Sequence, residues 1–219
     1  STAQEDIWCD AAGPVRFEKT VFMRGTAAGI YKTGTGLMSF TNCLVARYSG
    51  QGINAYSGPM RLWNVTSAGN SGWGVRVVLG VVTARNCIAW ANTSGGFEGG
   101  SVAYSCAQEP LPGLGNIQVD PCFVDTKYYH LESRAGHYTN GYFGGGGWTN
   151  STVTNSPCMD AGDPAAAWQN EQQPNRHRVN LGAYGNTAVA SKSFIREPGI
   201  FTKLSVATYP PVNVTTGGA

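Results

Sequence analysis

A chain of 219 residues with 30 glycines and only 13% charged residues fits a single turn-rich, all-β domain. Its formal net charge of +2 gives no electrostatic argument for a nucleic-acid partner. No apolar run approaches the ~20 residues that cross a bilayer, so no membrane span is predicted.

Residues 1–13 precede a repeated region and contain one apolar group, Ile7-Trp8-Cys9. We expect a cap or a partial coil here, because the open end of a repeat array exposes apolar side chains and unpaired strand edges. Either Trp8 and its neighbours plug this end, or another chain or a further part of the same chain continues the array. The polar start at Ser1, without a signal peptide, predicts a processed or excised fragment.

Residues 14–118 contain a repeat of 22 residues. Asn42, Asn64 and Asn86 each begin the pattern Asn-apolar, and Gly-apolar follows ten residues later in all three copies. Apolar and polar residues alternate within each copy, and Gly, Ser and Asn separate the copies, so short β-strands are predicted. A unit of this length cannot bury its own apolar face, and we therefore expect the units to stack as coils.

Stacking places equivalent residues of successive coils in files, ~4.8 Å apart. The file of Asn42, Asn64 and Asn86, here called the Asn file, is predicted at a bend where the amides hydrogen-bond from coil to coil. A glycine file suits a corner that needs positive φ or a close backbone approach. The two interior files are Val15, Met38, Met60, Val82 and Phe17, Phe40, Leu62, Ala84, and the glycines are Gly29, Gly52, Gly74 and Gly96.

Arginines and aromatic residues occupy outward positions of the coils, and Arg24 and Arg47 are equivalent on neighbouring coils. A guanidinium can fork a carboxylate or sulfate while a ring stacks on the pyranose, so these residues could bind an acidic sugar. The alternative is that outward arginines provide solubility and cover apolar surface with their stems. The candidate ligand-binding residues are Arg24, Arg47, Trp63, Arg85 and Trp90, with Arg16 and Arg61 also outward.

Residues 119–193 are predicted to form a loop-rich closing segment of the stack. Four carboxylates in it could make a calcium site if their loops converged. Turn capping is the preferred interpretation, because these acids come singly or as a pair. The three histidines show no metal-ligand spacing, so no metal and no cofactor are predicted. The four acids are Asp120, Asp125, Asp160 and Asp163.

Six cysteines predict disulfides if the chain is exported. Cys87 and Cys106 are expected in one file on neighbouring coils, at a separation that permits a bridge. Cys122 and Cys158 lie in the related phrases DPCFVD and SPCMDAGD and form a second expected pair, which leaves the other two as a third. The alternative is that cysteines such as Cys43 and Cys87 are small buried residues with free thiols. The candidates are Cys9, Cys43, Cys87, Cys106, Cys122 and Cys158.

Asn-X-Ser/Thr sequons make Asn92, Asn150 and Asn213 candidates for glycosylation. Asn64 also begins a sequon, but it belongs to the Asn file and is expected to stay unmodified. Residues 194–219 are interpreted as a linker or tail toward a further β-domain or a partner.

The phrases TNCLVARYSGQGI and RNCIAWANTSGGF resemble the right-handed parallel β-helix repeats of bacterial surface and secreted proteins, including the polymorphic outer-membrane type. The run DPCFVDTKYYHLESRAG, followed by SPCMDAGDP and HRVNLGAYGNTAVASKS, is similar to the closing segment of such proteins. The resemblance covers roughly Pro14 to Ser193. It implies an all-β fold, a right-handed parallel β-helix of about 4–5 coils, in a group that includes lyases and adhesins.

Catalysis is not favoured by the acids of the coils. A lyase of this fold needs a base, and often calcium held by several acids on one face. Residues 14–118 offer only Glu18, Glu98 and Glu109, and the first two are nearly four coils apart. Glycoside hydrolysis needs two carboxylates ~5 to 9.5 Å apart, and no such pair is expected.

We therefore expect a non-catalytic, structural or adhesive module of a surface-displayed or filament-forming protein, located outside the cell or on its surface. The expected partners are identical subunits stacked end to end or further domains of a parent chain. The alternatives are a module that binds acidic polysaccharide and a lyase-like enzyme.

Overall fold

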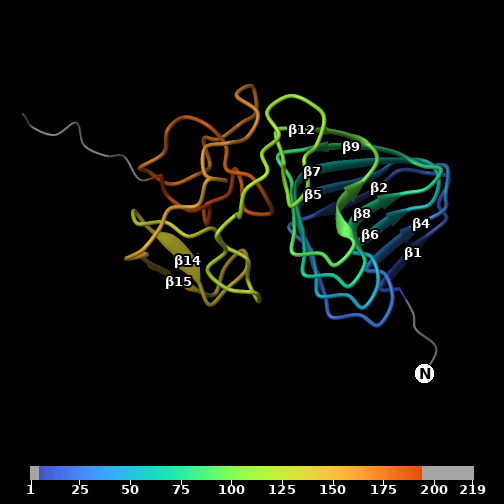
Figure 1. The fold of residues 1–219 in the computed structure, drawn as a ribbon, viewed down its shortest axis with the longest axis horizontal. Helices are drawn as coiled ribbons and strands as arrows, with labels where there is room; N and C mark the ends of the chain where they lie inside the picture. Colours follow the sequence, from blue (N-terminus) through green and yellow to red (C-terminus); the bar gives the residue numbers. More distant parts are fainter. Residues whose placement is uncertain (1–4, 194–219) are drawn as a thin grey trace, which may run out of the picture.

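The computed structural model describes residues 5–193, and this part of the chain contains fifteen β-strands and no helix. Strands β1 to β13 form a parallel β-solenoid of about five turns, and a loop-rich segment lies beside it (Figure 1). The predicted all-β fold of stacked coils is confirmed. The expected linker at residues 194–219 lies outside the described residues.

Two parallel sheets form the walls of the solenoid. The first sheet contains, in spatial order, β1 (Ile7–Cys9), β4 (Ile30–Lys32), β6 (Ile53–Ala55), β8 (Trp73–Val77) and β11 (Gly95–Glu98). The second contains β2 (Val15–Glu18), β3 (Val21–Met23), β5 (Met38–Ala46), β7 (Pro59–Ala68), β9 (Val81–Arg85), β10 (Ile88–Trp90), β12 (Ser101–Ala103) and β13 (Cys106–Ala107).

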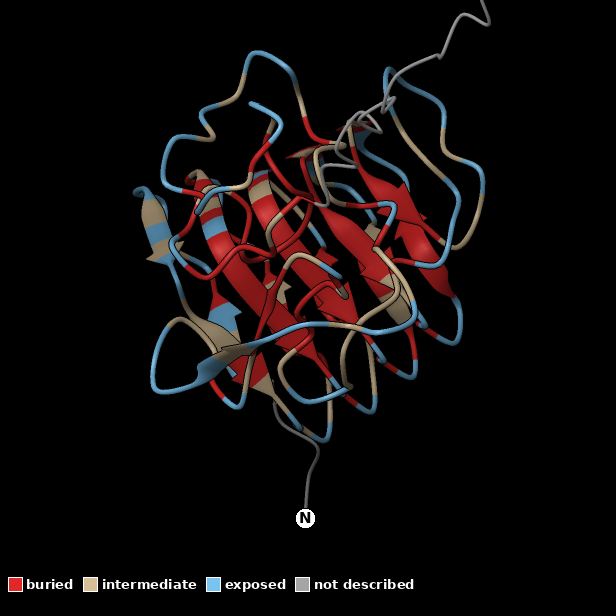
Figure 2. Cartoon of the chain, turned by 90° about the vertical axis from the view of Figure 1, so that its left-hand side faces the viewer, coloured by how far each residue is buried: buried red, intermediate tan, exposed pale blue. Residues whose placement is uncertain are grey.

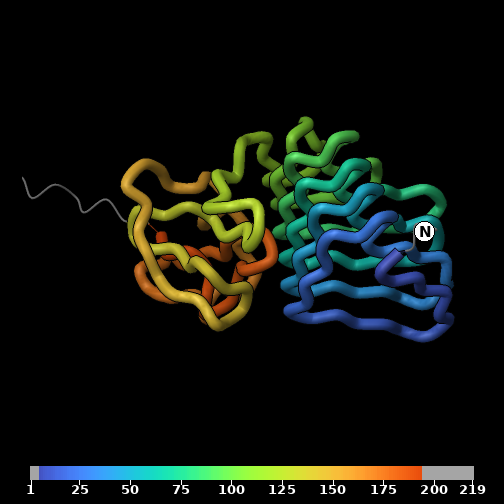
Figure 3. The backbone as a smooth tube through the Cα atoms, turned by 90° about the horizontal axis from the view of Figure 1, so that it is seen from below, coloured from blue at the N-terminus to red at the C-terminus, as the bar shows by residue number. Residues whose placement is uncertain are grey.

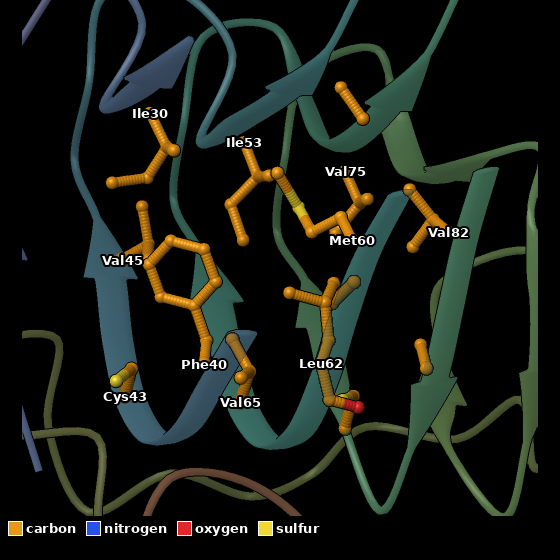
Figure 4. Close-up of a cluster of buried hydrophobic side chains, with 14 of the residues drawn as sticks. Ile30, Phe40, Cys43, Val45, Ile53, Met60, Leu62, Val65, Val75 and Val82 are labelled. Atoms are coloured by element: carbon orange, nitrogen blue, oxygen red, sulfur yellow. The ribbon is translucent and has the colours of Figure 1, made fainter. Parts of the chain in front are cut away.

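The pairing register of the second sheet follows the 22-residue repeat. Met38 pairs with Met60, and Met60 with Val82, so one predicted interior file is observed. Phe40 and Leu62 belong to the other file and are both fully buried between the sheets (Figure 4). The stacked coils thus bury the apolar face that one coil would leave exposed.

The Asn file lies at the bend between the two halves of the long strands. Asn42, Asn64 and Asn86 have φ of 53°, 51° and 55°, and Lys19 and Tyr104 hold the same bend in the first and last coils with φ of 47°. Asparagine tolerates this left-handed conformation better than other side-chain-bearing residues. The file is therefore explained by backbone conformation as well as by its hydrogen bonds.

The predicted hydrogen bonding of the Asn file from coil to coil is wrong. Asn42 Nδ2 donates instead to the carbonyl oxygens of Ala183 and Gly185, at 2.9 and 2.7 Å. Asn64 Nδ2 donates to the carbonyl of Asn180 at 3.3 Å, and Asn86 Oδ1 accepts from the amide of Asp163 at 2.7 Å. These amides reach sideways because the segment beside the solenoid presents free backbone groups to them.

An amide ladder does occur, at a different corner. Asn70 Nδ2 donates to Asn92 Oδ1 at 2.8 Å, and Asn70 Oδ1 accepts from the amide of Tyr48 at 3.0 Å. Gln108 continues the ladder, because its Oε1 accepts from the amide of Asn92 at 2.9 Å. The step from Tyr48 to Asn70 and on to Asn92 is again 22 residues.

The glycine file is explained by close approach and not by positive φ. A Cβ on Gly52 would lie 2.8 Å from the carbonyl oxygen of Gly74, and one on Gly74 would lie 2.7 Å from that of Gly96. Neighbouring backbones at this corner therefore leave no room for a side chain.

Residues 119–193, here called the lateral segment, pack against a side of the solenoid and do not close its end (Figures 1 and 3). The segment has little regular structure beyond one antiparallel pair, β14 (His137–Thr139) and β15 (Gly147–Thr149). Its Tyr129 and Tyr184 pack on Leu44, Ala46 and Ala68 of the second sheet. Figure 2 looks onto this covered side, where the strands beneath the loops are buried.

The two ends of the solenoid differ. Residues 108–118 cover the last coil, where the Glu109 carboxylate accepts from the amides of Gly96 and Phe97 at 2.8 and 2.7 Å. Asn116 Oδ1 likewise accepts from the amide of Ser105 at 3.0 Å. At the other end, strands β1, β2 and β3 each pair on one side only among the described residues. One end is thus capped and the other presents strand edges.

The six cysteines are free, so the two expected disulfides are absent and the remaining two cysteines are unbonded as well. Cys106 pairs in register with Ile88, one residue away from the expected alignment with Cys87. A slip of one residue turns a side chain to the opposite face, so Cys87 points into the core and Cys106 toward the lateral segment. Cys43 and Cys87 are buried free thiols, as the alternative interpretation predicted.

Cys122 and Cys158 are also unbonded, and so are Cys9 and Cys43. Cys9 belongs to the first sheet and Cys43 to the second, and both line the core between the sheets.

Candidate ligand-binding face

The outward side of the second sheet carries two rows of polar and aromatic side chains on strands β2, β5 and β7. The register places Arg16, Ser39 and Arg61 side by side in one row. It places Glu18, Thr41 and Trp63 in the next row, two residues further along each strand. The six residues Arg16, Glu18, Ser39, Thr41, Arg61 and Trp63 are called the Arg–Trp face below.

A shallow open groove runs along this face between Arg16 and Arg61, with Ser39 and Thr41 in its lining. Both arginines are exposed. The Arg61 guanidinium carbon lies 5.2 Å from the centre of the Trp63 ring, a cation–π contact that holds the side chain over the sheet. The groove therefore offers two cations, two hydroxyl groups and the Glu18 carboxylate, and the half-buried Trp63 indole lies beside it in contact with Arg61.

Arg85 neighbours Trp63 in register but is engaged elsewhere. Its Nη1 lies 2.5 Å from Asp163 Oδ2 of the lateral segment, and the two side chains are 43% and 13% exposed. Arg85 therefore helps to hold the lateral segment and has less freedom to bind a ligand than Arg16 or Arg61.

The other residues predicted to bind a ligand lie apart from this face. Arg24 and Arg47 are exposed at the second bend of their coils, with φ of 70° and 65°. Trp90 packs against the apolar cluster under the lateral segment. Of the five predicted residues, Trp63 and Arg85 are neighbours in the register of this sheet, and Arg24 and Arg47 are neighbours at the second bend, one residue beyond the paired Met23 and Ala46. Period-2 alternation within each 22-residue unit is the sequence signal that places Arg61 beside Trp63.

Three of the four aspartates of the lateral segment cap turns, as preferred from the sequence, whereas Asp160 Oδ1 accepts from the Ser193 hydroxyl at 2.7 Å. Asp120 Oδ1 accepts from the amide of Cys122 at 2.8 Å, and Asp163 Oδ1 from that of Ala165 at 2.9 Å. Asp125 Oδ1 accepts from the amide of Lys127 at 2.7 Å. Between residues 5 and 193, no group of three His, Cys, Asp or Glu side chains is arranged to hold a metal ion.

The candidate glycosylation sites differ in their exposure to solvent. Asn92 is 2% exposed and its Nδ2 donates to the carbonyl of Ser67 at 3.0 Å, so the folded chain has no room for a glycan there. Asn64 is buried as well. Asn150 is exposed and stays a candidate, and Asn213 lies outside the described residues.

Glu171 is a buried carboxyl group that organises the lateral segment. Its Oε1 accepts from the amides of Asn180 and Asn186, both at 2.8 Å, and its Oε2 from Asn175 Nδ2 at 2.8 Å. Burial raises the pKa of Glu171 to about 7, because removal from water disfavours the carboxylate more than these donors favour it.

Glu171 therefore makes a contribution to stability that falls as the pH rises from about 4.5 to about 7, whereas burial lowers the pKa of His130 to about 4 and gives a contribution that rises over about the same window. In this window the folded protein keeps a proton on Glu171 that the unfolded chain has lost, so the stabilisation present at low pH disappears. Glu171→Gln should remove the contribution of Glu171, which is roughly 3 kcal/mol across this window. Urea unfolding at several pH values measures it, with Glu98→Gln at a half-exposed ion pair as the control. Equal pH slopes in all three proteins would contradict the prediction.

In the part of the chain that the structure describes, no helix is long and apolar enough to cross a membrane. Comparison of the chain with protein-family models, curated proteins and solved structures found no match. Its function is therefore inferred from the residues and their geometry.

Proposed function

We propose that the chain is a non-catalytic structural or adhesive module of an extracellular or cell-surface protein, and that it terminates a β-solenoid rod. The difference between the two ends carries the proposal. Glu109 and Asn116 occupy the backbone groups at the edge of the last coil, whereas β1 to β3 leave edges unpaired at the first. Unpaired strand edges accept further strands, so this module joins its partner through the first coil alone.

The family resemblance supports the extracellular part of the proposal. We assign the coils to the right-handed parallel β-helix repeats of bacterial secreted and surface proteins, on the phrases around Asn42 and Asn86. The expected end-to-end filament is revised, because growth by stacking needs two open ends and residues 108–118 occupy one.

The positions of the coil acids support a role without catalysis. Glu98 Oε2 lies 2.8 Å from Arg76 Nε, and the Glu109 carboxylate is held by two backbone amides. Glu18 is then left as the coil carboxylate that lines the groove. One carboxylate does not meet the requirement of the hydrolytic and lyase mechanisms for paired acids or a metal site.

Association of two copies through their first coils is the test. Ile7 donates its amide to the carbonyl of Gly29, so the Trp8 amide points away from β4 toward the open edge. We expect sedimentation and electron microscopy to detect pairs that do not grow into filaments. Trp8→Pro removes the outward amide and should weaken pairing about tenfold or more.

Trp8→Ala is the matched control for this substitution, because it removes the same exposed ring and keeps the amide. Long filaments, or a strict monomer at high concentration, would contradict the proposed end. An unsaturated product that absorbs in the ultraviolet, formed from an acidic polysaccharide, would instead support the lyase alternative.

The Arg–Trp face favours a second function, the binding of an acidic polysaccharide. Arg16 and Arg61 line one groove and can each fork a carboxylate or sulfate, while the Trp63 ring offers a surface for a sugar. These residues replace Arg24 and Arg47 as the ones proposed to bind.

Arg61→Ala is expected to weaken binding of a sulfated or uronate polysaccharide about tenfold, measured by calorimetry at fixed ionic strength. Arg76→Ala is the matched control, because it makes the same change of charge on the other sheet. An equal loss of affinity in both variants would indicate nonspecific attraction, and unchanged affinity would remove the site.

A further inference from the structure

Three of the six thiols gather where the last coil meets the lateral segment. Cys106 lies on β13, and Cys122 and Cys158 belong to the lateral segment. Cys106 and Cys158 are both fully buried, and they share an apolar cluster with Ile88, Leu131 and Leu181. Cys122 is half-buried.

The thiols of Cys106 and Cys158 lie in the same buried cluster and interact electrostatically, while Cys106 Sγ is directed at the carbonyl oxygen of Val119 at 3.1 Å. The backbone around each one is fixed: the amide of Cys106 donates to the carbonyl of Cys87 at 2.9 Å, and the carbonyl of Cys158 accepts from the amide of Leu181 at 2.9 Å. Cys122 Sγ is directed at the carbonyl of Asp120, at 3.5 Å. Cys106 is therefore the thiol partner of Cys158, and Cys122 stands at the edge of the cluster.

We propose that Cys106 and Cys158 form a disulfide that fastens the last coil to the lateral segment, with Cys122 as the thiol that an oxidant meets first. The two bonding thiols come from parts of the chain 52 residues apart. The bond would close that loop across the seam between the solenoid and the lateral segment, and so restrict the unfolded chain.

The oxidant is a low-molecular-weight disulfide such as oxidised glutathione, and the exchange balances without a metal. The Cys122 thiolate attacks one glutathione sulfur, forms a mixed disulfide and releases the first glutathione thiolate. Cys106 then attacks the Cys122 sulfur and releases the second. Finally Cys158 attacks Cys106 and returns Cys122 as a thiol. Two protons and two electrons pass from Cys106 and Cys158 to one oxidised glutathione, which leaves as two reduced molecules.

Accessibility sets the first step, because Cys122 is the half-buried thiol of the three even though burial and the nearby Asp120 and Glu132 raise its pKa. The electrostatics of Cys106 and Cys158 agree with the later steps. Interaction with the Cys158 thiol lowers the pKa of Cys106, and the same interaction together with burial raises the pKa of Cys158. Cys106 is thus the readier nucleophile. Within the core, burial raises the pKa of Cys43 to about 11 and that of Cys87 to about 12, so these two thiols serve as unreactive internal references.

Peptide mapping of the folded full chain tests the proposal. The reduced protein is incubated with oxidised glutathione, its remaining thiols are alkylated, and it is digested with trypsin and an endoprotease that cleaves before Asp. Cleavage before Asp120 separates Cys122 from Cys106. The expected product links residues 86–119 to residues 135–159, and the melting temperature should rise by about 5 to 15 °C and return on reduction.

Fragmentation of the linked peptide distinguishes Cys106 from Cys87, which lies on the same fragment. Cys122→Ser should yield the same link about tenfold more slowly, whereas Cys106→Ser and Cys158→Ser should yield none. A final product that links Cys122, or six thiols that all stay alkylatable, would overturn the proposal. Comparing the oxidised and reduced natural chain keeps the test valid even where a variant fails to fold.

Discussion

Leu62→Ala is expected to lower the free energy of unfolding by about 3 to 5 kcal/mol. Leu62 is fully buried in an interior file, in register with Phe40 on one side and Ala84 on the other (Figure 4). Its strand β7 is hydrogen-bonded to β5 and β9, so the backbone cannot move inward to fill the space. The truncated side chain therefore leaves a cavity, and urea unfolding followed by tryptophan fluorescence measures the loss.

Leu79→Ala is the matched control for this prediction. It makes the same chemical change at a position that is 72% exposed, so the expected loss is below about 0.5 kcal/mol. If the two variants lost the same amount, the interior of the coils would not be the main source of stability.

Asn92→Ala is expected to cost about 3 kcal/mol, because one side chain satisfies three buried groups. Its Oδ1 accepts from the amide and from the side-chain Nδ2 of Asn70, at 3.0 and 2.8 Å. Its Nδ2 donates to the carbonyl of Ser67 at 3.0 Å. Alanine leaves all three without a partner in a place that water does not reach, and thermal or urea unfolding reports the difference.

Asn150→Ala serves as the control, because Asn150 is exposed and is also the asparagine of a sequon. Its replacement should change stability by less than about 0.5 kcal/mol. A loss at Asn92 no larger than at Asn150 would mean that the amide ladder at this corner does not contribute to stability.

The coils could be predicted from the sequence because their residue pattern repeats every 22 residues. Once the 22-residue step is found, stacking aligns Met38 with Met60 and Phe40 with Leu62, and burial follows from alternation. The same step relates Asn70 to Asn92, yet these were overlooked because Asn42, Asn64 and Asn86 are the more regular phrase. Asn42, Asn64 and Asn86 recur because the backbone at this bend has a φ near 50°, which asparagine tolerates.

The lateral segment was less predictable, because it has no period to align. Its role is visible only in contacts between residues far apart in sequence, such as Asn42 with Ala183. The predicted alignment of Cys106 with Cys87 was wrong because the repeat shortens at this coil. Cys106 is in register with Ile88 instead, and this shift of one residue turns its thiol to the other face of the sheet. The Arg–Trp face needed the observed register to show that Arg61 and Trp63, rather than Arg24 and Arg47, share a surface with Arg16.

Repeat proteins whose units touch only their neighbours can unravel one unit at a time from an end. The lateral segment changes this behaviour here, because it reaches every coil of the stack. Its contacts fall in turn on Met23, Asn42, Asn64, Asn86 and Cys106. No coil can detach while the segment stays in place, so the solenoid is expected to unfold as one cooperative unit. Partly unravelled forms, whose bare strand edges would invite aggregation, are thereby kept rare.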